Sequence, residues 1–472
     1  MKPMNPMRPM KTVLIANRGE IALRILRACR DAGLQVAVVY STEDVNSRVV
    51  GLADKAICIG PPQARRSYLN GAAIIEAACR VGADAIHPGY GFLSEDPDFA
   101  EACERSGLTF IGPPAGVVAR LGDKAAARAL MEQVGVPILP GSGRTVEDAE
   151  EAMQAAAGLG YPVIVKAVAG GGGKGMRAVL EPQALPRAYQ ETRAAAQQLF
   201  GDSRVYLERF LTVARHVEVQ ILRDHSGLAV HLGARDCSVQ RRHQKLIEET
   251  PAPRLPEGLT EKMGEAAVRG ADAAGYVGAG TFEFLVDRTG AFYFIEANCR
   301  IQVEHPVTEI VTGVDLVAEQ LRIAAGENLS LRQADLSARG AAVECRINAE
   351  DPDRDFVPAP GTLDLFDPPA GPWVRVDTYG YPGGKISPSY DSLLAKVITW
   401  GRDRDEALAR MRRALREFRI SGRGVRTTRD FLAEIISCPE FCAATHGTSL
   451  VDEVLSARLS DRSRAARRPD QR

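Results

Sequence analysis

The sequence predicts an α/β protein of about three domains that begins with a parallel sheet. The chain has 472 residues, and a domain commonly takes ~150 residues. Short apolar runs at 13–16 and 36–39 flank a segment in which Ile21, Ile25 and Cys29 recur at helical spacing. This strand–helix–strand order is typical of a parallel sheet. Hydrophobic residues make up 45% and charged residues 25%, which excludes a mainly disordered or coiled-coil protein.

The charge balance excludes some classes of partner. Lys and Arg total 59 and Asp and Glu total 60, so the net charge is −1. We therefore expect neither nucleic acid nor an acidic membrane surface as the main partner. The apolar runs are only strand-length, so no transmembrane helix is predicted. The nine cysteines form no CxxC pair, which favours free thiols and a cytoplasmic protein.

The two ends of the chain differ from the rest. Residues 1–9 have proline at positions 3, 6 and 9 and lack the apolar segment of a signal peptide. We expect a disordered extension there, with Met10 as an alternative start of translation. Residues 457–472 are rich in arginine and poor in large apolar residues, which predicts a solvated tail.

Glycine and proline divide the chain between these ends. Pro137, Pro140, Gly141 and Gly143 suggest one domain boundary, and 326–340 suggests another. The hydrophobic spacing predicts a helical segment at 117–136, a strand at 161–168, a helix at 316–325, and a last part at 341–454 that mixes strands with a helix near 404–418.

The first strand-to-helix turn carries Asn17, Arg18 and Gly19. A dinucleotide site at this turn would require a glycine fingerprint, G-x-G-x-x-G, which the sequence lacks. We therefore expect the first domain to be a scaffold rather than a nucleotide site.

The segment 281–305 contains the strongest sign of chemistry. Phenylalanines alternate on both sides of Thr289 and Gly290, which could form a two-residue hairpin turn. A hairpin closed there places Glu283 directly opposite Glu296, with Cβ atoms ~5 Å apart. Two opposed carboxylates repel each other, and a Mg²⁺ ion that also binds nucleotide phosphates would remove the repulsion.

The alternation is expected to continue beyond this hairpin. Glu296, Asn298, Arg300, Gln302 and Glu304 would then share one strand face. The functional interpretation is a row containing a metal ligand, an anion ligand and a base beside a phosphate. The alternative is an exposed face with internal ion pairs.

Residues 169–177 form a glycine-rich stretch that contains Lys174. Its backbone N–H groups could surround phosphates, although it is not a Walker A sequence and could be a flexible linker. Lys166 lies in an apolar strand and therefore needs a buried anionic partner, for which a triphosphate would serve. Lys124 could be a second phosphate ligand or an ordinary surface lysine.

Other charged residues have two interpretations each. His243 and Lys245 lie in a cationic stretch at 235–249, which is either a surface loop or an anion-binding segment. Arg346 lies in a half-buried strand, where it could form an ion pair or stabilise a developing oxyanion. His87 precedes a tight Pro-Gly turn and is expected to be structural, whereas His216 could reach a nucleotide.

These residues lie in motifs that resemble the biotin carboxylase subunit of acetyl-CoA carboxylase, an ATP-grasp enzyme. The resemblance extends from about residue 11 to 452, and its motifs are IANRGEIALRI, HPGYGFLSE, RDCSVQRRHQK, GAGTFEF, RIQVEHPVTE and ECRINAEDP. It implies a Rossmann-like N-terminal domain at 10–122, an ATP-grasp domain at 123–329 with a mobile lid at about 139–211, and an α+β C-terminal biotin carboxylase domain at 340–456.

The resemblance also implies roles for individual residues. The metal ligands for Mg²⁺ or Mn²⁺, with two ions expected, would be Glu283, Glu296 and Asn298. Catalytic residues would be Glu304 as the base that deprotonates bicarbonate, Arg300, Lys245, and Arg346 as the residue that binds biotin and stabilises its enolate. Bicarbonate would contact Lys245, Arg300, Gln302, Val303 and Glu304. ATP would contact Lys124, Lys166, Gly172, Gly173, Glu208, Arg209, Leu211, His216, Gln240, His243, Glu283 and Glu296.

The implied reaction has two steps. Bicarbonate attacks the γ-phosphate of ATP to give carboxyphosphate, and the CO₂ released from it carboxylates N1 of biotin. No Ala-Met-Lys-Met biotinylation motif is present, so biotin is expected on a separate biotin carboxyl carrier protein. Carboxyltransferase subunits and a homodimer are also implied, as is a role in malonyl-CoA formation for fatty acid biosynthesis.

Three alternatives remain. The chain could serve a propionyl-CoA, other acyl-CoA or pyruvate carboxylase. It could be another bicarbonate-using ATP-grasp ligase, or a non-catalytic ATP-binding subunit. Ala297 and Cys299 replace the family's usual Met and Thr, and are expected to point away from the ligands. Ser387 and Ser389 also depart from the family pattern, near Asp391.

Overall fold

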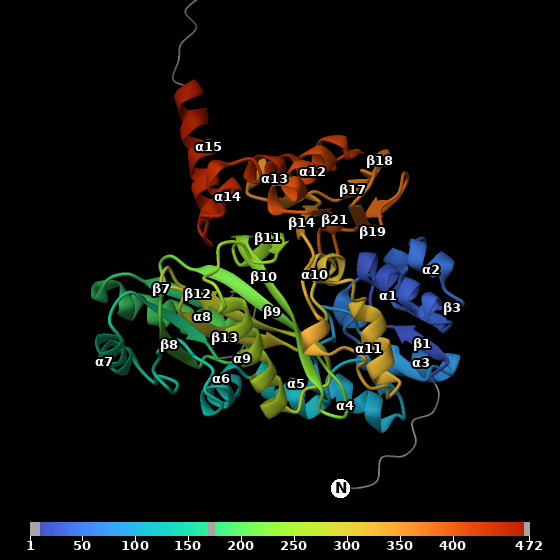
Figure 1. The fold of residues 1–472 in the computed structure, drawn as a ribbon, viewed down its shortest axis with the longest axis horizontal. Helices are drawn as coiled ribbons and strands as arrows, with labels where there is room; N and C mark the ends of the chain where they lie inside the picture. Colours follow the sequence, from blue (N-terminus) through green and yellow to red (C-terminus); the bar gives the residue numbers. More distant parts are fainter. Residues whose placement is uncertain (1–9, 169–174, 467–472) are drawn as a thin grey trace, which may run out of the picture.

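The computed structural model describes residues 10–168 and 175–466. Figure 1 shows an N-terminal region in blue, a middle region in green and yellow, and a C-terminal region in orange and red above both. The expectations for residues 1–9 and for Gly172 and Gly173 lie outside the described residues. The mixed α/β class predicted from the sequence is confirmed.

The N-terminal region is a parallel sheet in the order β3-β2-β1-β4-β5. Strand β1 is buried along its whole length, as expected for a parallel strand covered by helices on both faces. The predicted strand–helix–strand unit is confirmed by β1, α1 and β2. The strands are β1 (Thr12–Ile15), β2 (Gln35–Ser41), β3 (Lys55–Gly60), β4 (Ala85–His87) and β5 (Thr109–Phe110), and the helices are α1 (Gly19–Asp31), α2 (Arg48–Leu52), α3 (Gly71–Val81) and α4 (Pro97–Arg105).

A small antiparallel sheet, in the order β7-β6-β8, follows three short helices, α5, α6 and α7. The helical segment predicted at 117–136 is divided at Asp123, whose side chain accepts a hydrogen bond from the Ala126 N–H and so caps the second helix. These elements are α5 (Ala115–Gly122), α6 (Lys124–Gln133), α7 (Ala149–Leu159), β6 (Val163–Ala167), β7 (Met176–Val179), α8 (Leu185–Phe200) and β8 (Val205–Arg209).

An antiparallel eight-stranded sheet connects the middle and C-terminal regions. Its order is β13-β12-β9-β10-β11-β14-β21-β19, so the pair β11–β14 joins strands from the two regions. Its strands are β9 (Arg215–Arg223), β10 (Ala229–Arg241), β11 (Gln244–Thr250), β12 (Gly278–Val286), β13 (Phe292–Asn298), β14 (Ala341–Asn348), β19 (Val374–Thr378) and β21 (Leu393–Gly401), and its nearby helices are α9 (Leu259–Ala274), α10 (His305–Thr312) and α11 (Leu316–Ala324).

The alternation along β14 separates an apolar face from a charged face. Val343, Cys345 and Ile347 join the apolar core beneath α12 (Arg404–Glu417). Ala342 instead packs with α10, and with a period of two Glu344 and Arg346 share its face. The charged face of the sheet therefore lies toward α10.

The C-terminal region completes the fold with short strands and helices. Its last helix, α15 (Leu450–Ala466), rises from the body in Figure 1. The segment predicted as a solvated tail therefore begins as helix. The remaining elements are β15 (Glu350–Asp351), β16 (Val357–Pro358), β17 (Gly361–Thr362), β18 (Leu365–Asp367), β20 (Lys385–Ile386), β22 (Arg419–Ser421), α13 (Arg429–Ile435) and α14 (Pro439–Cys442).

A buried lysine connects all three regions. Lys396 on β21 is fully buried, and its Nζ donates to the Val303 carbonyl at 2.8 Å. The same Nζ lies 3.1 Å from Glu20 Oε1 on α1 and 3.9 Å from Asp377 Oδ2 on β19. Lys396 thus holds the backbone next to Glu304 against both the N-terminal and the C-terminal regions.

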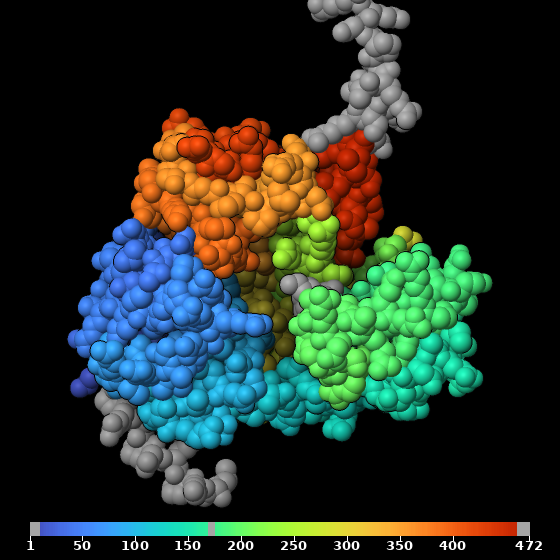
Figure 2. All heavy atoms as spheres, turned by 180° about the vertical axis from the view of Figure 1, so that it is seen from behind, coloured from blue at the N-terminus to red at the C-terminus, as the bar shows by residue number. Residues whose placement is uncertain are grey.

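Figure 2, seen from the opposite side, shows a hollow between the blue N-terminal region, the orange C-terminal region and the green part of the middle region. Among the described residues, no helix combines the length and apolar character that crossing a membrane requires.

Candidate active site

The carboxylate pair predicted from the sequence is present. Strands β12 and β13 pair antiparallel with Glu283 opposite Glu296, which confirms the predicted register at that point. The predicted two-residue turn is wrong, because the loop spans residues 287–291 and is held by Asp287 Oδ1, which accepts from the Thr289 and Ala291 N–H groups. A bulge between Glu283 and Phe284 restores the register that the longer loop would otherwise change.

The polar side chains predicted to share one strand face do lie close together, but they do not lie on one strand. Strand β13 ends at Asn298, so the predicted extended segment through residue 304 is wrong. Asn298 Nδ2 and Gln302 Nε2 nevertheless donate to Glu283 Oε1 at 2.7 and 3.2 Å, and Arg300 Nη1 donates to Gln302 Oε1 at 2.9 Å. Glu304 lies at the start of α10. The turn brings the side chains together around Glu283.

Lys245 on β11 is the cationic centre of this group. Its Nζ lies 2.6 Å from Glu218 Oε2, 3.0 Å from Glu283 Oε1 and 2.6 Å from Glu304 Oε1. Burial disfavours the charged lysine, but the three carboxylates raise its pKa well above the usual value. Burial likewise opposes ionisation of Glu304, yet Lys245 and Arg346 hold the pKa of Glu304 well below its usual range.

Arg346 on β14 lies on the other side of Glu304. Its Nη2 lies 2.8 Å from Glu304 Oε2 and 2.5 Å from Glu248 Oε1 on β11. The structure thus gives the ion pair that the sequence left as one alternative for Arg346. Because Glu304 is bracketed by Lys245 and Arg346, it is fixed as a carboxylate between two cations.

His216 and Gln240 lie beside the carboxylate pair. His216 Nε2 is 2.6 Å from Glu283 Oε2, and Gln240 Nε2 is 3.4 Å from His216 Nδ1. Burial lowers the pKa of His216, but Glu283 outweighs it and the net pKa is raised. His243 follows at the turn between β10 and β11 in a left-handed conformation, with φ +66°.

The lysines predicted to contact phosphates lie near the same centre. Lys166 on β6 forms an ion pair with Glu208 on β8, and Arg128 also pairs with Glu208. The buried anionic partner that Lys166 required is therefore a carboxylate of the chain itself. Lys124 Nζ lies 4.0 Å from Glu296 Oε2, which connects this group to the carboxylate pair. Arg209 at the end of β8 is exposed, and Leu211 is half-buried.

The carboxylate pair fits a divalent cation. Burial raises the pKa of Glu296, and the charge of Glu283 raises it further, so the two carboxylates repel each other. A hard cation held by Glu283, Glu296 and the Asn298 amide oxygen would remove this repulsion. Another group of potential ligands, Glu218, Cys237 and Glu304, does not fit as well, because both of its carboxylates have a cation at 2.6 Å. In the carboxylate pair, Glu283 also has close cations, but Glu296 lies 4.0 Å from Lys124 Nζ.

Glu218, Glu248, Arg235 and Lys396 were missed by the sequence reasoning. Each is fully buried. For Lys396 the signal was a charged residue inside an otherwise apolar strand, the same signal that singled out Lys166. Glu218, Arg235 and Glu248 lie on strands with other polar residues, so they carried no such signal. Ala297 and Cys299 pack in an apolar core, as expected for side chains that point away from the polar centre.

His87 is structural, as predicted. It is fully buried, and its Nδ1 accepts a hydrogen bond from the Gly89 N–H. Burial and the nearby Arg24 lower the pKa of His87 to about 3, so the imidazole is neutral near pH 7.

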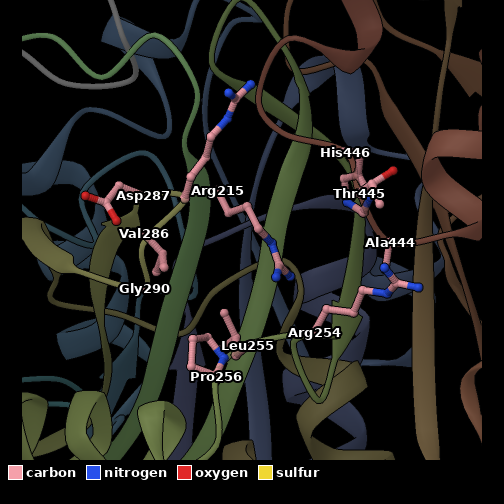
Figure 3. A pocket seen from close by; sticks show the side chains of 11 residues that line it. Arg215, Arg254, Leu255, Pro256, Val286, Asp287, Gly290, Ala444, Thr445 and His446 are labelled. Carbon is pink, nitrogen blue, oxygen red and sulfur yellow. The ribbon is translucent and has the colours of Figure 1, made fainter.

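A cavity of about 330 Å³ lies elsewhere, between the β12–β13 loop and residues 444–446. Figure 3 shows Arg215, Arg254 and His446 around it. Within the described part of the chain, none of the residues that the sequence assigned to a site lines this cavity. Arg215 and His216 are adjacent on β9, so by strand alternation they point to opposite faces.

Comparison with known protein families identifies the class of protein to which the chain belongs. The chain matches the family models "Biotin carboxylase, N-terminal domain" at residues 9–118, "Carbamoyl-phosphate synthase L chain, ATP binding domain" at 123–332 and "Biotin carboxylase C-terminal domain" at 344–453. It is an ATP-binding enzyme of the ligase class.

The relatives define the family. The chain is 53% identical over 442 residues to a biotin carboxylase of Nostoc sp., covering 94% of this chain and 98% of that one. It is 50% identical over 441 residues to a pyruvate carboxylase subunit of Methanothermobacter thermautotrophicus, covering 93% of this chain and 89% of that one. The chain belongs to the biotin carboxylase family.

A solved structure has the same fold. The biotin carboxylase domain dimer of Hydrogenobacter thermophilus 2-oxoglutarate carboxylase, in complex with MgADP, ADP and bicarbonate, matches with a TM-score of 0.91 and 45% identity. The match covers 94% of this chain and 98% of that chain.

Proposed function

We propose that this enzyme uses ATP and bicarbonate to carboxylate biotin carried on a separate biotin carboxyl carrier protein. The observation that carries the proposal is Glu304, held between Lys245 and Arg346 at 2.6 and 2.8 Å. We assign Glu304 as the base, Lys245 as the cation that binds the anion and Arg346 as the cation that stabilises the oxyanion, and their close contact supports this assignment. The similar Hydrogenobacter thermophilus structure contains MgADP and bicarbonate, which supports the same ligands here.

In the first step, Glu304 takes the proton of bicarbonate while a bicarbonate oxygen attacks the γ-phosphorus of ATP and ADP leaves. Lys245, Arg300, Gln302 and Val303 would hold bicarbonate. The deeply depressed pKa of Glu304 makes it a weak base at rest. Bicarbonate would compete with Glu304 for Lys245, and weakening that contact would raise the pKa of Glu304 toward the value a base requires.

The nucleotide would lie on the side of Lys124 and Lys166. We assign ATP contacts to Lys124, Lys166, Gly172, Gly173, Glu208, Arg209, Leu211, His216, Gln240, His243, Glu283 and Glu296. Bound at Glu283, Glu296 and Asn298, one or two Mg²⁺ or Mn²⁺ ions would neutralise charge on the transferred phosphoryl group. Closure of a lid at about 139–211 would keep water from carboxyphosphate.

In the second step, carboxyphosphate breaks down to CO₂ and phosphate, the released phosphate takes the N1 proton of biotin, and N1 attacks the CO₂. The negative charge that develops on the biotin ureido oxygen needs a fixed cation. Arg346 is the cation on the far side of Glu304 from Lys245, and we assign it to the biotin enolate.

We further propose that the chain performs the first half-reaction of acetyl-CoA carboxylase, with carboxyltransferase subunits completing malonyl-CoA formation for fatty acid biosynthesis. We expect a cytoplasmic homodimer. The nine free cysteines suit a reducing compartment, and the similar Hydrogenobacter thermophilus domain is a dimer. Service to a pyruvate or other acyl-CoA carboxylase is a second candidate, favoured by the 50% identity to the Methanothermobacter thermautotrophicus pyruvate carboxylase protein.

ADP release from purified protein with Mg-ATP and bicarbonate, measured with and without free biotin, tests the activity. Release that requires bicarbonate and is stimulated by biotin is the expected result. Release indifferent to biotin would instead indicate another bicarbonate-using ligase. No release, even with a biotinylated carrier protein, would indicate a non-catalytic ATP-binding subunit. The acceptor is tested separately, by adding carrier and carboxyltransferase with acetyl-CoA, propionyl-CoA or pyruvate.

A further inference from the structure

Arg346 forms ion pairs with two carboxylates, Glu304 and Glu248, but the proposed reaction assigns a role only to Glu304. Its Nη2 lies 2.8 Å from Glu304 Oε2 and 2.5 Å from Glu248 Oε1. Glu304 and Glu248 are both fully buried, and they approach the guanidinium from different elements, the start of α10 and β11. The proposed mechanism gives Glu248 no role.

A second buried carboxylate at this position has a substantial cost. Glu248 is surrounded by Arg346, Glu304 and Lys245, and Glu344 lies directly opposite it on β14. Three carboxylates thus lie close together, and burying an ionised carboxylate is unfavourable unless a cation compensates it. Since Glu304 already pairs with Arg346, Glu248 is not needed to neutralise that arginine at rest.

The need for Glu248 arises when the reaction begins. Once Glu304 takes the bicarbonate proton, it becomes a neutral carboxylic acid and no longer attracts Arg346 as an anion. This happens just before Arg346 must face the biotin enolate. We propose that Glu248 is the positioning residue that holds Arg346 in place while Glu304 is protonated, an inference that rests on the proposed function.

The electrostatics around Glu248 support this sequence of events. Burial raises the pKa of Glu248 to about 7, with Arg346 lowering it and the charge of Glu304 raising it. When Glu304 becomes neutral, its charge no longer raises the pKa of Glu248. The ionised form of Glu248 is then favoured. Arg346 thereby keeps one carboxylate partner, Glu248, when Glu304 is protonated.

The Arg346 guanidinium also retains free hydrogen-bonding capacity. Among the described residues, its buried Nε has no hydrogen-bond partner, and neither oxygen of Glu248 accepts a well-aligned hydrogen bond. The Arg346–Glu248 contact is therefore an ion pair based on charge rather than on a directional bond. Removing the charge while keeping the shape should consequently remove most of the effect of Glu248.

The test is Glu248→Gln, which keeps the size and polarity of the side chain and deletes its charge. Two rates are measured: bicarbonate-dependent ADP release without biotin, which reports the first step, and incorporation of labelled bicarbonate into biotin, which requires Arg346. We expect the second rate to fall about tenfold or more, equivalent to about 1.4 kcal/mol of transition-state stabilisation, with the first rate changed less than about threefold. The loss should appear in kcat more than in the KM for biotin.

Glu344→Gln is the matched control. Glu344 is also fully buried and lies opposite Glu248, and burial raises its pKa well above the usual value. Among the described residues, the carboxylates that form ion pairs with Arg346 are Glu248 and Glu304, not Glu344. We expect both rates to match the wild type. Glu248→Asp, which restores the charge one methylene short, should recover part of the labelled product.

Two results would overturn the inference: normal incorporation of label in Glu248→Gln, or an equal fall of both rates. If Glu248→Gln does not fold, the same two rates in Glu248→Asp decide, since an equal fall of both would again indicate a structural role only. A wild-type enzyme without biotin-stimulated ADP release would overturn the proposed function instead, which keeps the two failures distinct.

Discussion

Replacing Lys396 by Met should destabilise the protein severely, because the change leaves a buried carboxylate without its cation. Lys396 Nζ lies 3.1 Å from Glu20 Oε1 and 3.9 Å from Asp377 Oδ2. Asp377 keeps Arg375, whose guanidinium donates to it at 2.7 and 2.9 Å. Glu20 keeps only the Tyr90 hydroxyl among its described partners.

The magnitude follows from these contacts. Breaking a buried ion pair by removing one partner costs about 3–5 kcal/mol, and losing the hydrogen bond to the Val303 carbonyl adds about 1 kcal/mol. The sum, about 4–6 kcal/mol, is a large part of the stability of a typical domain, about 5–15 kcal/mol. Burial raises the pKa of Glu20 in the fold, and Lys396 opposes that rise. Without the lysine the pKa of Glu20 should rise further, so the loss of stability should be greater at pH 8 than at pH 6, because ionisation of Glu20 then favours the unfolded chain.

Urea denaturation followed by tryptophan fluorescence suits this measurement. The protein has two tryptophans, Trp373 and Trp400, whose ring centroids lie 4.6 Å apart, and Trp400 is on the same strand as Lys396. The double variant Lys396→Met with Glu20→Gln should recover at least about 2 kcal/mol, because it no longer buries an unpaired charge. A loss below about 1 kcal/mol, or additive effects of the two substitutions, would refute the reasoning.

The remaining predictions concern catalysis, pH and metal. Glu304→Gln should abolish bicarbonate-dependent ADP release while leaving the protein folded, because Lys245 keeps Glu218 and Arg346 keeps Glu248; normal turnover would remove Glu304 from the role of base. As the pH falls from 7.5 to 5.5, His87 should lower the free energy of unfolding by about 1.4 kcal/mol. The reason is that the pKa of His87 in the fold is about 3, so only the unfolded chain binds the proton in this range. A His87→Gln variant that keeps the whole pH dependence would contradict this. EDTA should stop ADP release, and Mg²⁺ should raise the melting temperature of the wild type but not of a variant with Glu283→Gln and Glu296→Gln; equal shifts in both would place the ion elsewhere.

Local patterns predicted the parts of the fold in which neighbours in sequence are neighbours in space. The parallel unit β1–α1–β2 and the Glu283–Glu296 pair both depend on residues a few turns or one hairpin apart. The five-residue β12–β13 loop was not predictable from its glycine, because the side chain of Asp287 determines it. The predicted pairing of Glu283 with Glu296 was nevertheless right, because the bulge between Glu283 and Phe284 offsets the longer loop.

The cluster of buried charged side chains near Lys245 could not be predicted from the spacing of residues in the sequence. Glu218, Glu248 and Lys396 lie on three different strands and meet only through the order of the eight-stranded sheet, which has no local signal. The resemblance supplied Lys245, Glu304 and Arg346 as functional residues. It did not supply the carboxylates that set their charge, and those came from the structure.

The pairing of β11 with β14 has a practical consequence for work on fragments of this protein. A piece that stopped after α11 would expose the N–H and C=O groups of β11 along an edge that normally receives β14. Its buried Glu248 and Glu249 would also lose Arg346 and Arg404. Unprotected strand edges recruit other chains, so such a fragment should aggregate, whereas cuts in the β12–β13 loop, which is held by its own Asp287, should be tolerated.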